Sequence, residues 1–439
     1  MDRSRILILL WFVTLVAALG TGRDLLYNLF YLLTILLVVA YLWAWSGTRW
    51  MRVVRYTRTG RSQVGKMAEE RLTITNTSPI PKLWIEVRDS STLPDHRVSQ
   101  VLSPLGSGRS RSWTIKTLCQ RRGRYTLGPL SLHSGDPFGL FTSERQLEEP
   151  GPRSFIVYPA TVDLPGFTPP IGFLPGGDAL RRRTHYVTTN VAGVRDYAPG
   201  DSFNRIHWPS SARANRLISK EFELDPTADI WLYVDLERDV QIEPIWANLE
   251  EPATPILPWE REPGLTLAPS TVEYGITATA SLARHFITRD RAVGLVAYSD
   301  QREVIPADRG ERQLTKILET LAVISAGGRI PMAEIIAAEG AHLGRNTTVV
   351  VITPSPFPHW VAPVRDLERR GLKVIAVVLE PRSFGAREGH EPLLAELIAS
   401  GIVTYRIQEG DDLAVALGQA YHLQPTTIIP EGEASPSAR

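Results

Sequence analysis

DIWLYVDLERD, residues 229–239, is the stretch that decides the fold of the C-terminal half of this 439-residue chain. Its apolar run from 230 to 234 lacks alternation, which is typical of a strand buried on both faces, and it closes on Asp235. Segments with strand-like and helix-like periodicity alternate after it. Such alternation predicts right-handed crossovers and a mainly parallel sheet covered by helices on both faces. We therefore expect a doubly wound α/β domain over residues 228–423.

The elements of this domain follow from the spacing of apolar residues. A short strand over 303–306 is expected to be antiparallel at an edge of the sheet. The tail, residues 424–439, is polar and contains proline, which predicts disorder. The other expected strands are 292–298, 347–352, 373–379 and 402–406, and the expected helices are 272–289, 314–321, 360–370, 391–400 and 411–422.

Oxygen-bearing side chains follow several of these strands. In doubly wound sheets ligands sit beyond the carboxyl ends of the strands, near the point where the strand order reverses. Carboxylates and hydroxyls are the ligands that hard cations such as Mg²⁺ prefer. We therefore expect a contact site at this edge. Its residues are Asp235, Glu237 and Asp239 after the first strand, Ser325 before a later helix, and Thr353 at the end of the fourth strand.

This arrangement resembles a von Willebrand factor A-like domain, whose first strand ends in an Asp-x-Ser-x-Ser motif. In that family a threonine and an aspartate from two later loops complete a divalent-metal site. Here Glu237 and Asp239 stand where the serines would be, Ser325 is a loose match to the threonine, and Thr353 replaces the second aspartate. The resemblance implies a degenerate metal site. These departures favour a carboxylate loop without metal over an intact Mg²⁺ site.

The segment 237–269 is an insertion between the first strand and its helix. It carries six prolines, two tryptophans and seven acidic residues, and its position places it over the same edge of the sheet. A lid or partner-binding arm is one interpretation. A tolerated surface loop is the other, because loops accept insertions at small entropic cost.

VAGVRDYAPGDSFNRIHWPSSARANRLISKEFE, residues 191–223, is dense in charged and aromatic side chains and belongs to a segment over 191–227. One interpretation is a paired network that clamps the segment onto the α/β domain, since buried charges must be paired. The other is a charged docking surface, because Arg and Trp are common interface anchors. We favour the clamp. Locally we expect Ser210 or Ser211 to cap a turn after Pro209 and a strand over 217–224.

This segment resembles the signature of domain-of-unknown-function family fifty-eight. The match runs Tyr197-x-x-Gly200-Asp201-Ser202-x-x-Arg205-Ile206-His207-Trp208, then Ser211-Ala212-Arg213, then Lys220-Glu221-Phe222-Glu223, with Arg195 upstream. Residues 136–141, DPFGLF, match a second family motif. His207 departs from the family, which more often carries Asp there. We expect these signature residues to form contacts rather than a catalytic site.

The resemblance implies two N-terminal membrane helices, a β-sandwich, the signature and a von Willebrand A-like domain. Members are often encoded beside MoxR-type AAA ATPases and transglutaminase-like membrane proteins. It therefore implies an adaptor that works with a MoxR-type ATPase, in envelope assembly or protein maturation. No Cys-His-Asp set, nucleophile elbow, phosphate loop or zinc helix is present in the sequence, so we expect no enzyme activity.

Residues 51–160 show the alternation of a β-rich domain. Short strands are expected at 71–75, 83–88, 112–116 and 125–127, separated by turns, which argues for an immunoglobulin-like β-sandwich. The DPFGLF stretch is expected to form a turn with two buried aromatic residues. Residues 161–190, rich in proline and glycine, are expected to be a linker.

Two apolar runs, 6–19 and 25–45, lie in the first 50 residues and predict a two-helix membrane hairpin. A cleaved signal peptide is the alternative for the first run. Arg3 and Arg5 precede it, and a basic run over 49–66 follows the second, so both ends and the soluble bulk should face the cytoplasm. The opposite orientation would make the chain an envelope-side ligand-binding or adhesion module. Trp43, Trp45 and Trp50 are expected to form an aromatic belt.

The totals set limits on partners. Lys plus Arg (48) nearly balances Asp plus Glu (47), so no global field favours nucleic acid. The single cysteine, Cys119, excludes an intramolecular disulfide and multi-cysteine metal sites. The expected partners are therefore the bilayer and other proteins.

Overall fold

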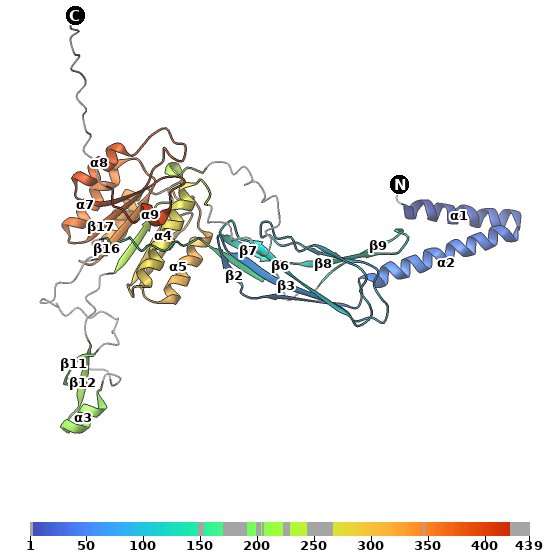
Figure 1. The fold of residues 1–439 in the computed structure, drawn as a ribbon, viewed down its shortest axis with the longest axis horizontal. Helices are drawn as coiled ribbons and strands as arrows, with labels where there is room; N and C mark the ends of the chain where they lie inside the picture. Colours follow the sequence, from blue (N-terminus) through green and yellow to red (C-terminus); the bar gives the residue numbers. More distant parts are fainter. Residues whose placement is uncertain are drawn as a thin grey trace, which may run out of the picture. The chain divides into compact units, whose positions relative to one another are not determined.

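The computed structural model describes residues 3–147, 153–169, 191–198, 203, 206–222, 229–243, 267–345 and 347–421, with the side chains of 191–193 and 220–222 left aside. The chain divides into two compact units, the first made mainly of residues up to Ala160 and the second mainly of residues from Thr161. Each unit is described by itself (Figure 1).

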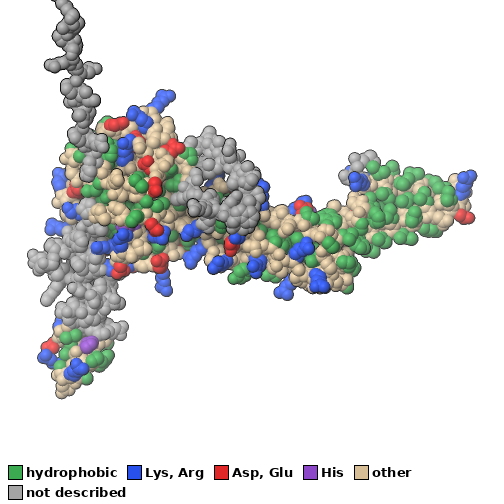
Figure 2. Space-filling model, viewed as in Figure 1, with side chains coloured by type: hydrophobic (Ala, Val, Ile, Leu, Met, Phe, Trp, Pro, Cys, Tyr) green, Lys and Arg blue, Asp and Glu red, His purple; other side chains and the backbone are tan. Residues whose placement is uncertain are grey.

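The two apolar runs form helices α1 (Arg3–Thr21) and α2 (Asp24–Gly47), each long and apolar enough to cross a membrane. The helices pack side by side, with the indole N–H of Trp11 donating to Oγ1 of Thr34 at 2.8 Å. Hydrophobic side chains cover the outside of this hairpin (Figure 2). The placement of the helices agrees with the sequence prediction, and the apolar exterior supports membrane anchoring.

Three sheets follow the helices in the first unit. A core of buried apolar residues joins the first two, with Leu72 and Ile74 from one sheet and Ile85 and Leu132 from the other. Two antiparallel sheets packed face to face are the arrangement that the alternation predicts. The sheets are β1 (Met51–Thr57), β3 (Met67–Asn76) and β6 (Ser110–Leu118); β5 (Gln100–Leu102), β4 (Ile85–Asp89), β8 (Leu130–Gly135) and β9 (Thr142–Gln146); and β2 (Arg61–Gln63), β10 (Arg153–Tyr158) and β7 (Gly123–Leu127).

The second unit contains a six-stranded sheet in the order β15-β14-β13-β16-β17-β18. If the six strands of this sheet are numbered in chain order, their order is the 3-2-1-4-5-6 of a doubly wound sheet, with its switch point between β13 and β16. All pairs are parallel except β14 with β15 at the edge, as the sequence predicts. The strands are β13 (Ile230–Val234), β14 (Val293–Tyr298), β15 (Arg302–Asp308), β16 (Thr348–Thr353), β17 (Lys373–Leu379) and β18 (Val403–Ile407).

Helices cover both faces of this sheet. On one face α4 lies against four strands, and Gly275 faces Ile352 and Leu379. The alternate residues Val351 and Val378 point to the other face, into a core closed by α6, α7 and α8. The helices are α4 (Thr271–Ile287), α5 (Glu311–Val323), α6 (Met332–Gly340), α7 (Val361–Arg369), α8 (Glu391–Ala399) and α9 (Leu413–Ala416), with short 3-10 turns η2 (Arg238–Val240) and η3 (Pro358–Trp360).

Some expectations differ from the structure. The sequence predicts a helix over 411–422, but α9 ends at Ala416, and a Cβ atom on Gly418 would crowd the carbonyl oxygen of Ala414 at 3.0 Å. The helix α6 was expected after Ser325 without bounds, and the strands β1, β2, β5, β8, β9 and β10 were not predicted. Residues 424–439 lie outside the described residues.

The expected linker begins later than the sequence indicates, because 161–169 packs on the second unit. Phe167 is 2% exposed and contacts the rings of His285, Phe286 and Tyr405 at 5.3, 5.9 and 5.1 Å between centroids. The amide of Val162 donates to Oγ of Ser281 at 2.9 Å. This segment covers the outer side of α4, which explains why α4 is buried on nearly every side.

Candidate functional site at the carboxyl edge of the parallel sheet

Asp235 and Thr353 meet at the switch point of the sheet, where β13 and β16 end side by side. Oγ1 of Thr353 donates to Oδ2 of Asp235 at 2.6 Å, and the amide of Glu237 donates to Oδ1 at 3.0 Å. The amide of Ser355 in turn donates to Oγ1 of Thr353 at 2.9 Å. The Asp235 carboxyl group therefore ties together the two loops that leave the central strands.

The environment of Asp235 disfavours its charge. The residue is 3% exposed, and the Thr353 hydroxyl and Glu237 amide that donate to its carboxyl group are neutral. Burial is the main cause that raises its pKa from 3.8 to about 6, while the Thr353 hydroxyl and the Glu237 amide act in the opposite direction. Because such a pKa lies near neutrality, this carboxyl group changes protonation within the physiological range.

The five residues predicted to hold a metal do not fit a metal centre. Both oxygens of Asp235 already accept protein hydrogen bonds, and the residue is sealed from solvent. Among the residues that the structure describes, no group of three or more His, Cys, Asp or Glu side chains is placed to hold an ion. Backbone pairing between Glu237 and Gly328 brings the loop that carries Ser325 to this edge. The degenerate site is thus a hydrogen-bonded loop junction.

An acidic rim, defined as Glu237, Asp239 and Glu334, lies on the accessible side of this junction. Burial raises the pKa of Glu237, and the charges of Asp239 and Glu334 raise it further, while His359 lowers it. Phe357, 48% exposed, stacks on the His359 ring at 6.0 Å. The rim thus combines negative charge with an exposed aromatic side chain. Glu237 and Asp239 were predicted from the sequence, whereas Glu334 from α6, His359 from η3 and Phe357 just before η3 were not.

The buried His390, which precedes α8, hydrogen-bonds to the same edge of the sheet. Nε2 of His390 lies 3.2 and 3.1 Å from the carbonyl oxygens of Pro354 and Ser355, so it donates to the loop after β16. Burial is the main cause that lowers the pKa of His390. Glu380, at the end of β17, lies 3.2 Å from Nη2 of Arg406 and 3.9 Å from Nδ1 of His390. His390 and Glu380 are buried and position the edge, whereas the Arg406 side chain is 31% exposed.

The family signature forms a separate small substructure. β11 (Val191–Asp196) pairs antiparallel with β12 (Ile218–Phe222), and α3 (Trp208–Ala214) precedes β12. The strand predicted over 217–224 is therefore confirmed within the described residues. Ser210 and Ser211 were predicted to cap α3, but His207 occupies the N-cap position and both serines lie inside the helix.

Hydrogen bonds within the signature explain some of its polar residues. Nδ1 of His207 lies 2.7 Å from Oγ of Ser210, and its amide donates to the carbonyl of Ile218 at 2.8 Å. Arg195 donates to the carbonyl of Asp196 at 3.1 Å, and Tyr197 lies 6.2 Å from the Phe203 ring. Trp208 is 63% exposed. This exposure suits the docking interpretation, whereas the expected clamp stays a prediction.

For the other signature residues the structure gives only the backbone position or no description. Arg213 lies in the last turn of α3, and Lys220 and Glu221 belong to β12 through their backbones. The remaining signature residues, Gly200, Asp201, Arg205 and Glu223, lie outside the described residues, as does most of the insertion over 237–269.

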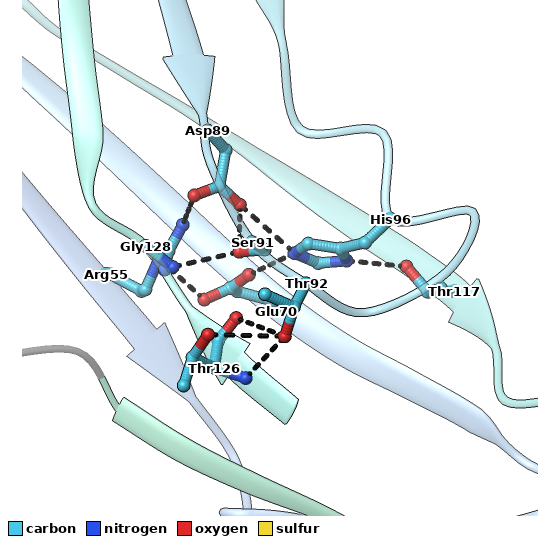
Figure 3. Close-up of polar contacts among 9 residues, drawn as sticks. All are labelled: Arg55, Glu70, Asp89, Ser91, Thr92, His96, Thr117, Thr126 and Gly128. Carbon is cyan, nitrogen blue, oxygen red and sulfur yellow. Dashed lines mark hydrogen bonds and ion pairs between the residues drawn. The ribbon is translucent and has the colours of Figure 1, made fainter. Parts of the chain in front are cut away.

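A buried charge network in the first unit was missed entirely by the sequence analysis (Figure 3). Arg55 Nε lies 2.9 Å from Glu70 Oε1, and its Nη2 lies 2.7 Å from Asp89 Oδ1. Nε2 of His96 lies 2.9 Å from Glu70 Oε2, and its Nδ1 lies 2.8 Å from Oγ1 of Thr117. The side chains of Arg55, Glu70, Asp89 and His96 are all less than 5% exposed. This network locks β1, β3 and β4 together.

Arg55 corrects one part of the sequence interpretation. It belongs to the basic run that was assigned to membrane orientation, yet its side chain points inward. The signal was present in the alternation, since Glu70 shares the phase of Leu72 and Ile74, which are fully buried. A charged residue in an apolar phase predicts an internal ion pair.

Taken together, the fold and site define a chain with two apolar N-terminal helices, packed antiparallel sheets and a doubly wound α/β unit with an acidic edge. A family model described as "Protein of unknown function DUF58" matches residues 193–243. The match runs from the signature hairpin through β13 to the acidic rim, so it includes Asp235, Glu237 and Asp239.

Other comparisons give weaker similarity. The chain is 23% identical over 164 residues to "Uncharacterized protein YeaD" of Bacillus subtilis (strain 168), covering 37% of this chain and 34% of that protein. It thus spans about a third of that relative's length. Among solved structures, the CARDB domain of PF1109 from Pyrococcus furiosus is 17% identical with a TM-score of 0.19, covering 24% of this chain and 91% of that one. The FixG-related protein from Vibrio parahaemolyticus is 15% identical with a TM-score of 0.15, covering 24% and 94%.

Proposed function

We propose that this chain is a membrane-anchored protein-interaction module without enzyme activity of its own. In this proposal α1 and α2 hold the chain in the bilayer, and the acidic rim receives a protein partner that carries positive charge. The supporting observation is the rim itself, where the charges of Asp239 and Glu334 act on Glu237, together with the exposed Phe357, which stacks on the His359 ring. Exposed aromatic residues and complementary charge are common at protein interfaces.

The finer identity of the units belongs to the same proposal. The strand order 3-2-1-4-5-6 with an antiparallel edge strand supports a von Willebrand A-like second unit, and two packed antiparallel sheets support an immunoglobulin-like first unit. The partner that the family resemblance implies is a MoxR-type AAA ATPase, with a transglutaminase-like membrane protein as a further candidate. The basic flanks of the helices support a cytoplasmic location of both units.

Charge reversal at the rim tests the interaction. The variant Glu237→Lys/Asp239→Lys should lower recovery of a co-expressed MoxR-type ATPase about tenfold or more at low salt, and added salt should weaken the wild-type interaction. Glu311→Lys is the matched control, because it is an exposed acidic residue next to the opposite end of the sheet, after Asp308, and should leave recovery unchanged. Equal recovery for all three proteins would reject the rim as the contact site.

Topology is tested separately. A reporter that works only in the cytoplasm should be active when fused after Lys66, and a reporter that works only outside the membrane should be inactive at the same position. Activity restricted to the outer side of the membrane would reject the adaptor proposal in favour of an envelope-side ligand-binding or adhesion module.

A further inference from the structure

The turn between β8 and β9 satisfies the hydrogen-bonding capacity of its own backbone N–H groups. Asp136, 3% exposed, accepts hydrogen bonds from the amides of Phe138 and Leu140 at 2.8 Å each and of Phe141 at 2.6 Å. The Gly139 amide donates to the carbonyl of Asp136 at 3.3 Å, and the Asp136 amide donates to the carbonyl of Phe141 at 3.2 Å. Proline 137 has no N–H group. Every backbone donor from 136 to 141 is therefore satisfied within the turn.

The outside of this turn is apolar. Phe138 is 55% exposed, and Leu140 and Phe141 are half-buried. The sequence analysis expected two buried aromatic residues here, and Phe138 contradicts it. A turn whose N–H groups are all satisfied internally, with apolar side chains outside, suits a medium poor in water, because unsatisfied donors cost several kcal/mol in a bilayer core.

The turn lies beside the expected membrane helices. The Phe141 ring meets the Tyr41 ring edge-on with centroids 5.9 Å apart. Tyr41 precedes the end of α2, Gly47, by six residues, so it lies about 9 Å inward along the helix axis. The 24 residues of α2 span about 36 Å, slightly more than the roughly 30 Å of a bilayer core. A centred α2 therefore places Tyr41, and the turn beside it, just inside the boundary of the core.

The start of α1 borders the same turn. A Cβ atom on Gly139 would stand 3.8 Å from Nη1 of Arg3. Gly139 itself has a φ of 69°, in the left-handed region that glycine adopts without strain. The turn therefore reaches the charged end of α1, where an arginine is expected to meet lipid headgroups.

The sheets are fixed to α2, so the turn cannot leave the boundary independently. Nζ of Lys82, a residue 2% exposed, donates to the carbonyl of Ser46 at 2.5 Å. The hydroxyls of Thr48 and Ser143 lie 3.0 Å apart, and the Trp45 and Trp50 rings are 5.7 Å apart. Three residues separate α2 from β1. The last of them, Trp50, has a φ of 56°, which makes the turn tight.

We propose that the β8–β9 turn is an interfacial wedge, in which Phe138, Leu140 and Phe141 enter the bilayer that α1 and α2 span. The partner is the boundary between lipid headgroups and acyl chains, where aromatic side chains concentrate. This inference rests on the membrane anchoring proposed above. It goes beyond that proposal because it assigns lipid contact to the first unit's sheets as well as to its helices.

Depth-dependent fluorescence quenching tests the wedge in full-length protein reconstituted into phosphatidylcholine–phosphatidylglycerol vesicles. Phe138→Cys is labelled with an environment-sensitive dye, in vesicles whose lipids carry a nitroxide either near the headgroup or deep in the acyl chain. The native Cys119 is 1% exposed, and burial raises the pKa of its thiol, so it should not react with the dye. Wild-type protein taken through the same labelling reaction is therefore the blank. Leu32→Cys, in the middle of α2, and Arg58→Cys, beyond the far end of β1, are matched controls.

The dye at 138 should be quenched several-fold more than the dye at 58, and more by the shallow nitroxide than by the deep one. The dye at 32 should be quenched most by the deep nitroxide. A dye at 138 that behaves like the dye at 58, while the dye at 32 is quenched, would overturn the wedge and leave the anchoring intact. Absence of quenching at 32 would overturn the anchoring and the wedge with it. Because Phe138 is largely exposed, its substitution should not unfold the protein.

Discussion

The buried carboxyl groups beside Arg55 in the first unit and the Asp235 carboxyl group in the second are accommodated in opposite ways. In the first unit Glu70 and Asp89 face Arg55, and His96 bridges Glu70 to Thr117. In the second unit Asp235 receives only hydroxyl and amide donors, and its pKa rises to about 6. Buried charge is compensated in the first site and left uncompensated in the second. The first site therefore serves the fold, whereas the second reduces stability at neutral pH, a property that is common where residues are retained for function.

Removing the cation of the first site should produce the largest effect. Arg55→Met leaves Glu70 and Asp89 buried without their arginine, which costs about 3–5 kcal/mol. Because Cys119 is buried in the same unit, its labelling by a thiol reagent reports opening of that unit. The rate of Cys119 labelling at constant pH should be roughly a hundredfold or more higher in Arg55→Met than in wild type.

Arg88→Met is the matched control for this prediction. Arg88 lies on β4 next to Asp89, but its side chain is 50% exposed and pairs with Glu86 at 2.8 Å on the surface. Exposed pairs contribute about 0–1 kcal/mol, so the labelling rate should change less than about tenfold. Equal acceleration in both variants would show that the buried network is not what stabilises the sheets.

Neutralising Asp235 should have the next largest effect, and with the opposite sign. Because its folded-state pKa, about 6, lies above its ordinary value of 3.8, folding favours the protonated carboxyl group. That contribution is fully present below about pH 4 and is lost as the pH rises through about 6. The Asp235→Asn variant has no carboxyl group to ionise, so it avoids this loss of stability. The difference in free energy of unfolding between the variant and wild type should therefore increase by about 3 kcal/mol between pH 4 and pH 8.

Hydrogen exchange in peptides covering β13 and β16, corrected for intrinsic rates at each pH, measures this difference in the full-length protein. Asp239→Asn is the control, because this exposed carboxyl group lies in the same loop and its substitution should leave the pH dependence as in wild type. Parallel stability profiles for wild type and Asp235→Asn would mean that Asp235 is not desolvated as the structure indicates.

The sequence predicted the second unit better than the first, for a physical reason. Strands buried on both faces are continuous apolar runs, and the switch-point rule brings the ends of β13 and β16 together without knowledge of side-chain packing. The meeting of Asp235 with Thr353 could therefore be predicted. The desolvation that prevents a metal site could not, since it depends on how closely the surrounding loops pack.

The buried network of the first unit depends on strand register. Arg55 pairs with Leu72 and Glu70 with Thr57, so Arg55 and Glu70 are diagonal neighbours across β1 and β3. Register is set by the whole sheet, and a shift of one residue would place each side chain on the opposite face. Local patterns show at most a charged residue in an apolar phase. They cannot name the partner that neutralises it.

The smallest expected effect tests whether hydrogen bonds from neutral donors stabilise the buried Asp235 carboxyl group. Thr353→Val removes the hydroxyl that donates to Asp235 and accepts from the Ser355 amide, with little change in shape. The expected loss is about 1–2 kcal/mol in the exchange of β13 and β16 peptides. It should be larger above pH 6 than below it, since a hydrogen bond to an ionised carboxylate is stronger than one to the acid. Thr353→Ser keeps the hydroxyl and should restore most of the loss. If Thr353→Val were as stable as wild type at every pH while Thr353→Ser lost stability, the methyl group of Thr353 would be the stabilising feature, and hydrogen bonding would not explain how this carboxyl group stays buried.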